Sequence, residues 1–175
     1  IMSKQLNCFI TKLTDLNKNL ELKVQERTRE LEEERNKLKL WNAEIQEQIH
    51  LARQIQKNLI PSVEPIENIA SFYQPMDLVG GDFYDFVIFK EDKKIGLFLS
   101  DVSGHGIPAA FITSMLKSFI IQAGELRKNP GELLNYLNKG LYNQTSGNFI
   151  TAFYGIFDPI TNAFHYANAG HNLPY

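Results

Sequence analysis

The chain has 175 residues, of which 43% are hydrophobic and 11% aromatic, and its 18 basic and 20 acidic residues give a formal net charge of −2. These values predict about one globular domain plus an extension, and they exclude the collagen-like and generally disordered classes. Because there is no basic excess, we expect no nucleic-acid partner. The single cysteine, Cys8, excludes a disulfide framework and a cysteine-rich metal site, so a reducing, cytoplasmic setting is expected.

No stretch of the sequence reaches the roughly 20 consecutive apolar residues that cross a bilayer, and no signal peptide opens the chain. We therefore expect no direct membrane contact in this segment. The first letters are IMSK, with an isoleucine before the methionine, which predicts a piece of a longer protein. That leaves room for an upstream sensor, including a membrane-bound one whose cytoplasmic output part this chain would be.

The composition changes near residue 60. All 11 glycines and all 7 prolines lie after it, so residues 1–60 lack the two strongest helix breakers. Their apolar residues recur mostly at alternating steps of three and four, the heptad pattern of a coiled coil, from Leu6, Phe9 and Leu13 to Ala52 and Leu59. Such a helix would be about 90 Å long and cannot bury its own stripe. We therefore expect a homodimeric coiled coil over residues 1–60.

The expected coil is irregular. Leu20, Val24 and Thr28 follow one another at steps of four, which locally unwinds a supercoil, and Arg35 and Asn42 occupy core-type positions, where polar residues fix the register. A coil that transmits a signal and a passive dimerisation rod both fit these features. The sequence leaves both open, together with the orientation of the two helices.

Residues 61–175 have a different pattern. Two prolines, Pro61 and Pro65, end the helix. Segments rich in aromatic and branched residues predict strands at 82–89, 94–100, 149–157 and 162–169. Helices are predicted at 108–126 and 130–144. Short turns join the strands into antiparallel hairpins, and a sheet of this kind with two adjacent helices belongs to the α+β class.

The first hairpin brings two aspartates together. Its turn centres near Asp92, so residues whose numbers sum to about 184 face one another, and Asp82 comes within about one residue of Asp101. Which face each side chain takes stays open, because a slip of one residue reverses it. Close carboxylates must share a proton or bind a cation, and oxygen donors suit Mg²⁺ or Mn²⁺ better than zinc. The alternative is that both aspartates are ordinary turn residues.

Three segments in order carry a resemblance to a known family. They read VGGDFYDF (79–86), SDVSGHGIPAAF (100–111) and YANAGHNLPY (166–175). Together they resemble the SpoIIE/RsbU-like serine phosphatases, a bacterial branch of the metal-dependent phosphatases (PPM) related to protein phosphatase 2C. The preceding ARQIQKNLIP (52–61) is similar to the lead-in of that branch, and the upstream helix is similar to signalling helices that join sensors to output domains.

The resemblance implies a β-sandwich flanked by helices, with two Mn²⁺ or Mg²⁺ ions at one end. By motif match, Asp82 would be the first acidic ligand, Asp101 the second, and the Val102 backbone carbonyl a further one. The ions would activate a water that attacks the phosphorus of phosphoserine or phosphothreonine, which makes the two aspartates the expected catalytic residues. The substrate would be a phosphorylated regulatory protein of the anti-sigma-factor-antagonist type.

Five further residues near these motifs have open roles: Gly81, Asp85, Gly104, His105 and His171. Asp85 would orient metal-bound water, but a period of two places it on the opposite face from Asp82. His105 suits a general acid or a packing role equally well. For His171, a hydrogen bond that fixes its loop is expected rather than chemistry.

The sequence departs from the family pattern at its end. In the family, further strands and a late acidic ligand follow the third motif, whereas this sequence stops at Tyr175. We therefore expect residues 61–175 to be the N-terminal portion of a phosphatase domain, truncated and with weak or no activity as given. The alternative is a catalytically inactive, phosphatase-like interaction module, which the presence of both aspartates disfavours.

Overall fold

The protein was analysed as a computed structural model, which describes residues 2–62, 69–75 and 78–173. Pro65, one of the two expected helix terminators, lies outside the described residues. The chain divides into two compact units, residues 1–47 and 48–175. No helix within the described part of the chain is long and apolar enough to cross a membrane.

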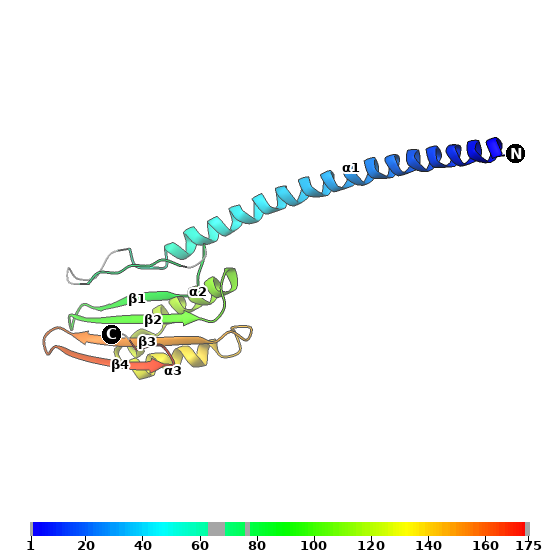
Figure 1. Cartoon of the computed structure of the whole chain (residues 1–175). Coiled ribbons are helices and arrows are strands. Elements are labelled where there is room, and N and C mark those ends of the chain that lie inside the picture. Colours follow the sequence, from blue (N-terminus) through cyan, green and yellow to red (C-terminus); the bar gives the residue numbers. More distant parts are fainter. Residues whose placement is uncertain (1, 63–68, 76–77, 174–175) are drawn as a thin grey trace. The chain divides into compact units, whose positions relative to one another are not determined.

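Helix α1 runs without interruption from Met2 to Lys57 (Figure 1). This continuity follows from the lack of glycine and proline, as the sequence predicts. The apolar stripe is exposed along the helix, and Leu31 and Leu38 show 64% and 56% of their surface to solvent. Ion pairs such as Arg29–Glu33, with 3.1 Å between Nε and Oε1, lie on its surface. Pairs of this kind contribute only a few tenths of a kcal/mol, up to about 0.5.

The second unit contains one antiparallel sheet in the order β1-β2-β3-β4. Its strands are Phe83–Phe89, Lys94–Val102, Ile150–Asp158 and Ala163–Ala169. All four predicted strands are therefore present, and the α+β class is confirmed. Of the β-sandwich that the resemblance implies, the described residues form this one sheet.

Two helices and a short 3₁₀ helix connect β2 to β3. They are α2, Ile107–Gln122; η1, Gly124–Lys128; and α3, Pro130–Leu141. The single helix predicted over 108–126 is wrong at its end, because Gly124 adopts a φ of 53° and breaks the α-helical path. The start of α3 is fixed by Asn129, whose Oδ1 accepts hydrogen bonds from the backbone N–H groups of Gly131 and Glu132.

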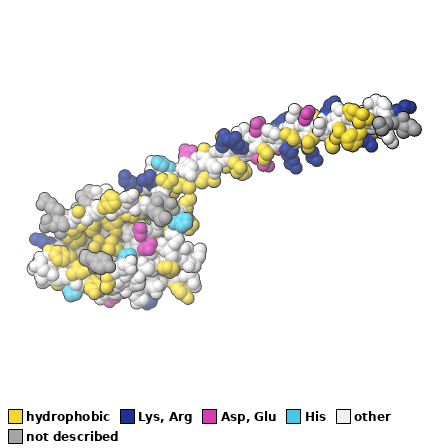
Figure 2. Space-filling view, in the orientation of Figure 1, with side chains coloured by type: hydrophobic (Ala, Val, Ile, Leu, Met, Phe, Trp, Pro, Cys, Tyr) yellow, Lys and Arg dark blue, Asp and Glu magenta, His cyan; other side chains and the backbone are white. Residues whose placement is uncertain are grey.

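The helices cover one face of the sheet (Figure 1), and the core lies between them. Fully buried side chains there include Phe98, Leu133 and Tyr154. The other face carries apolar side chains around a cavity of about 660 Å³, among them Phe86, Leu97 and Leu99. Figure 2 shows hydrophobic side chains gathered on the visible face of this unit.

Candidate metal centre

The β1–β2 ladder places Asp82 directly opposite Asp101. Phe83 pairs with Ser100, and the next position along the ladder is the aspartate pair. The backbone of Val102 donates a hydrogen bond of 3.3 Å to the carbonyl of Gly81, so the pairing continues beyond the two acids. The sequence analysis expected Asp82 within about one residue of Asp101, and the observed pairing lies within that range. Both aspartates are exposed, whereas Phe83 and Ser100, the neighbouring pair of the ladder, are buried.

The two carboxylates repel one another. The pKa of Asp82 is raised above its ordinary value, first by partial burial and then by the negative charge of Asp101, while His171 acts in the opposite direction. Two acids in this relation favour a shared proton or a bound cation. Asp101 in turn pairs with Thr151 of β3, so the row of polar residues extends across three strands at one end of the sheet.

The Val102 carbonyl lies against Gly81. A Cβ atom at residue 81 would come within 2.5 Å of that oxygen, so only glycine lets the backbone ahead of Asp82 approach it without a shift. Two carboxylates and a carbonyl are the hard oxygen donors that Mg²⁺ and Mn²⁺ prefer. The described residues contain no cluster of three or more His, Cys, Asp or Glu side chains placed to hold a metal ion. The donor set therefore fits an ion that keeps several water ligands.

The loop after Asp101 is fixed by Ser103. Its backbone N–H donates to the carbonyl of Phe149, and its Oγ accepts from the backbone N–H of Phe149, both at 2.9 Å. Gly104 follows with a φ of 90°, a conformation that strains any other residue. His105 is exposed in this loop between β2 and α2. The serine thus holds the segment that presents the Val102 carbonyl.

His171 lies close to the aspartates. Its Nδ1 is 2.9 Å from the Thr151 hydroxyl oxygen. The Asn168 side chain accepts from the backbone N–H of His171 and donates to its carbonyl, each at 2.8 Å. A hydrogen bond that fixes the loop is therefore present, as the sequence predicts. His171 and Asp82 also line the same cavity, of about 340 Å³.

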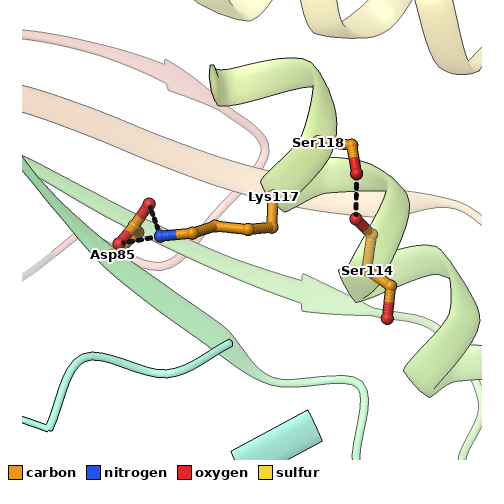
Figure 3. A network of polar contacts seen from close by, with 4 residues as sticks. All are labelled: Asp85, Ser114, Lys117 and Ser118. Carbon is orange, nitrogen blue, oxygen red and sulfur yellow. Dashed lines mark hydrogen bonds and ion pairs between the residues drawn. The ribbon is translucent and has the colours of Figure 1, made fainter. Parts of the chain in front are cut away.

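Asp85 lies apart from this cluster. It points to the helix-covered face, where both carboxylate oxygens are 2.7 Å from Nζ of Lys117 in α2 (Figure 3). Burial raises the pKa of Asp85, and the bonds and charge of Lys117 oppose that rise. The strand alternation predicts this separation from Asp82. The structure therefore gives Asp85 an ion-pair partner between sheet and helix.

Gln56 is a residue that the sequence analysis did not single out. Only 5% of it is exposed. Its amide donates to the Gly80 carbonyl at 2.7 Å and accepts from the Gly80 N–H at 3.1 Å, and it also donates to Thr113 Oγ1 at 3.1 Å. It thus fixes the segment that leads to Asp82. The sequence did contain a signal for its burial. Gln56 lies between Ala52 and Leu59 at the spacing of the apolar residues of the helix.

Comparison with known proteins identifies this region. Residues 91–175 match the family described as Stage II sporulation protein E (SpoIIE). The chain is 34% identical over 132 residues to phosphoserine phosphatase RsbU of Bacillus subtilis (strain 168), across 73% of this chain. The chain belongs to the SpoIIE/RsbU-like serine phosphatase family. It is also 31% identical over 133 residues to phosphoserine phosphatase RsbP of the same strain, across 71% of this chain.

The matches cover most of this chain but only part of each relative. This SpoIIE-family chain spans 39% of the length of RsbU and 32% of that of RsbP. Among solved structures, the SiaA-PP2C domain of Pseudomonas aeruginosa is similar, with a TM-score of 0.65 and 22% identity over 73% of this chain and 54% of that one. This likeness shows that the fold is that of the matching part of a protein phosphatase 2C domain.

Proposed function

We propose that this SpoIIE-family chain is part of a metal-dependent protein serine/threonine phosphatase. The observation that carries the proposal is the placement of Asp82 opposite Asp101, beside the Val102 carbonyl. The similarity to two proteins named phosphoserine phosphatases supports the reaction. The proposed substrate is a phosphorylated regulatory protein of the anti-sigma-factor-antagonist type.

The two aspartates and the Val102 carbonyl would hold Mn²⁺ or Mg²⁺. Bound divalent ions lower the pKa of water and neutralise charge on a phosphoryl group. The chain itself contributes the fixed separation of the carboxylates, through the paired backbones of Gly81 and Val102. It also brings His171 and aromatic residues such as Phe72 around the cavity next to Asp82.

Metal removal tests this proposal. The complete protein that contains this chain, used in this and the following activity tests, should release inorganic phosphate from a phosphoserine protein in the presence of Mn²⁺. It should lose that activity with a chelator and regain it when Mn²⁺ is restored. Calorimetric titration with Mn²⁺ should show binding. If Mn²⁺ does not bind and no phosphate is released, the chain is a non-catalytic interaction module and the proposal is wrong.

We also propose that α1 pairs with α1 of a second copy and relays a signal to the phosphatase portion. The exposed stripe that includes Leu31 and Leu38 supports pairing, since it leaves large apolar side chains in water. Sedimentation should give twice the chain mass of 20.1 kDa. The double substitution Leu31→Asp with Leu38→Asp should give monomers, whereas Asn36→Asp, which adds a charge outside the stripe, should stay dimeric. A monomeric unsubstituted chain would contradict this.

A further inference from the structure

We propose that His171 binds the phosphoryl group of the substrate through its Nε2 atom. The inference rests on the proposed phosphatase function and adds a substrate contact to it. It gives the third motif a role beyond holding its own loop. Of the two imidazole nitrogens of His171, Nδ1 contacts the Thr151 hydroxyl.

The Thr151 hydroxyl is within hydrogen-bond distance of Nδ1, one of the two ring nitrogens of His171. Its oxygen is 2.9 Å from Nδ1 of His171 and 3.5 Å from the carbonyl of Asp101. A neutral imidazole that accepts at Nδ1 carries its proton on Nε2. We infer the tautomer in which the Thr151 hydroxyl donates to Nδ1, and Nε2 is then a hydrogen-bond donor for another group.

The backbone around His171 is held as firmly as its ring. Asn168 bonds to both the N–H and the carbonyl of His171. Because ring and backbone are both fixed, the direction of Nε2 is set before any ligand arrives, and a preorganised donor binds its acceptor with less loss of conformational entropy. The Nδ1 contact alone would be enough for a histidine that only stabilises its loop. Such a role does not require the ring to lie beside Asp82 and Asp101.

The cavity beside His171 suits a phosphoryl oxygen. Asp82 and His171 both line this cavity. The other polar residues that line it are Tyr73, Gln74, Tyr84 and Ser100. The Tyr73 hydroxyl already donates to the backbone carbonyl of Asp82 at 3.0 Å, and the Ser100 hydroxyl donates to the Phe83 carbonyl at 3.5 Å. An anion held at the aspartates by cations needs N–H donors on its remaining oxygens, and His171 supplies one.

Two substitutions of His171 separate the roles of its nitrogens. The amide of asparagine reaches the position of Nδ1, whereas the amide of glutamine reaches that of Nε2. We expect His171→Asn to keep the loop contact with Thr151 but to lower kcat/KM for a phosphoserine protein by about 10- to 100-fold, the loss of a hydrogen bond to a charged group. His171→Gln should retain activity within a few-fold of the unsubstituted protein.

The control variants are Thr151→Val, which removes the hydroxyl at nearly constant shape, and His165→Asn, which changes an exposed histidine in β4. His165→Asn should leave every measurement unchanged. Thr151→Val should lower kcat/KM less than His171→Asn does. If instead His171→Asn is fully active while His171→Gln and Thr151→Val are impaired, His171 serves only to fix its loop and the inference is overturned.

Binding of inorganic phosphate gives a readout that does not depend on turnover. In the presence of Mn²⁺, phosphate affinity should fall about 10-fold or more in His171→Asn and persist in His171→Gln, with Mn²⁺ affinity unchanged in both. Equal phosphate affinity in all variants overturns the His171 contact while leaving the phosphatase proposal standing. Failure of the unsubstituted protein to bind Mn²⁺ or to release phosphate contradicts the proposed function itself.

Discussion

Replacing Asp82 with asparagine is expected to remove metal-dependent phosphate release while leaving the fold intact. The side chain is exposed just before β1 and lies opposite Asp101, so the change removes one carboxylate donor without disturbing the core. Loss of a ligand of this kind removes several kcal/mol of transition-state stabilisation, or at least about 100-fold in kcat/KM. The measurement is phosphate release at saturating Mn²⁺, with calorimetric titration of Mn²⁺ in parallel.

The same substitution should stabilise the metal-free protein at neutral pH. The pKa of Asp82 is raised in the folded state, so that state holds the proton more tightly than the unfolded chain does. The resulting stability is present at low pH and is lost as pH rises through the raised pKa. With chelator present, the melting temperature of Asp82→Asn should therefore exceed that of the unsubstituted protein near pH 7 and converge with it at acidic pH.

The matched control is Asp92→Asn, which removes a carboxylate from the turn between β1 and β2. It should leave phosphate release and Mn²⁺ binding unchanged. Unaltered activity of Asp82→Asn would contradict the metal centre. Lost activity together with a lowered melting temperature would show that Asp82 acts on the fold instead.

The sequence was sufficient to predict the aspartate pair but not its register. Alternating apolar residues and the charged turn fix the existence of the hairpin, and the centre of that turn sets which residues face one another. In the structure Phe89 pairs with Lys94, so four residues form the turn and its centre lies ahead of Asp92. Lys93 takes a positive φ of 54° there, which residue type alone does not predict.

Contacts between distant segments were beyond prediction. Gln56 reads as one more polar residue of a long helix, because its partners Gly80 and Thr113 become neighbours only in the folded chain. Strand alternation correctly separated Asp85 from Asp82, yet its partner Lys117 lies in a helix whose rotation against the sheet is set by packing. Local patterns thus gave the elements and the acidic pair, and packing supplied their supports.

Replacing Lys117 with methionine is expected to destabilise the fold by about 3 kcal/mol, because it leaves a buried carboxylate without its partner. The Asp85 side chain is 5% exposed and that of Lys117 25%, so solvent screens the pair weakly. Urea denaturation with chelator present measures the effect. Lys139→Met, at an exposed position of α3, removes the same charge and should change stability by less than about 0.5 kcal/mol.

The pH dependence of this loss identifies its cause. Burial raises the pKa of Asp85 and Lys117 opposes the rise, so removing the lysine lets that pKa rise further. The folded variant then gains a proton as pH falls through the raised pKa, and its deficit should shrink at acidic pH. Adding Asp85→Asn to Lys117→Met removes the buried charge and should restore part of the stability at neutral pH. A loss of stability that is the same at every pH would indicate lost packing by the lysine stem instead.

Because Asp85 and Asp82 lie on opposite faces, Mn²⁺ affinity of the folded variant should not change, which separates this ion pair from the metal centre.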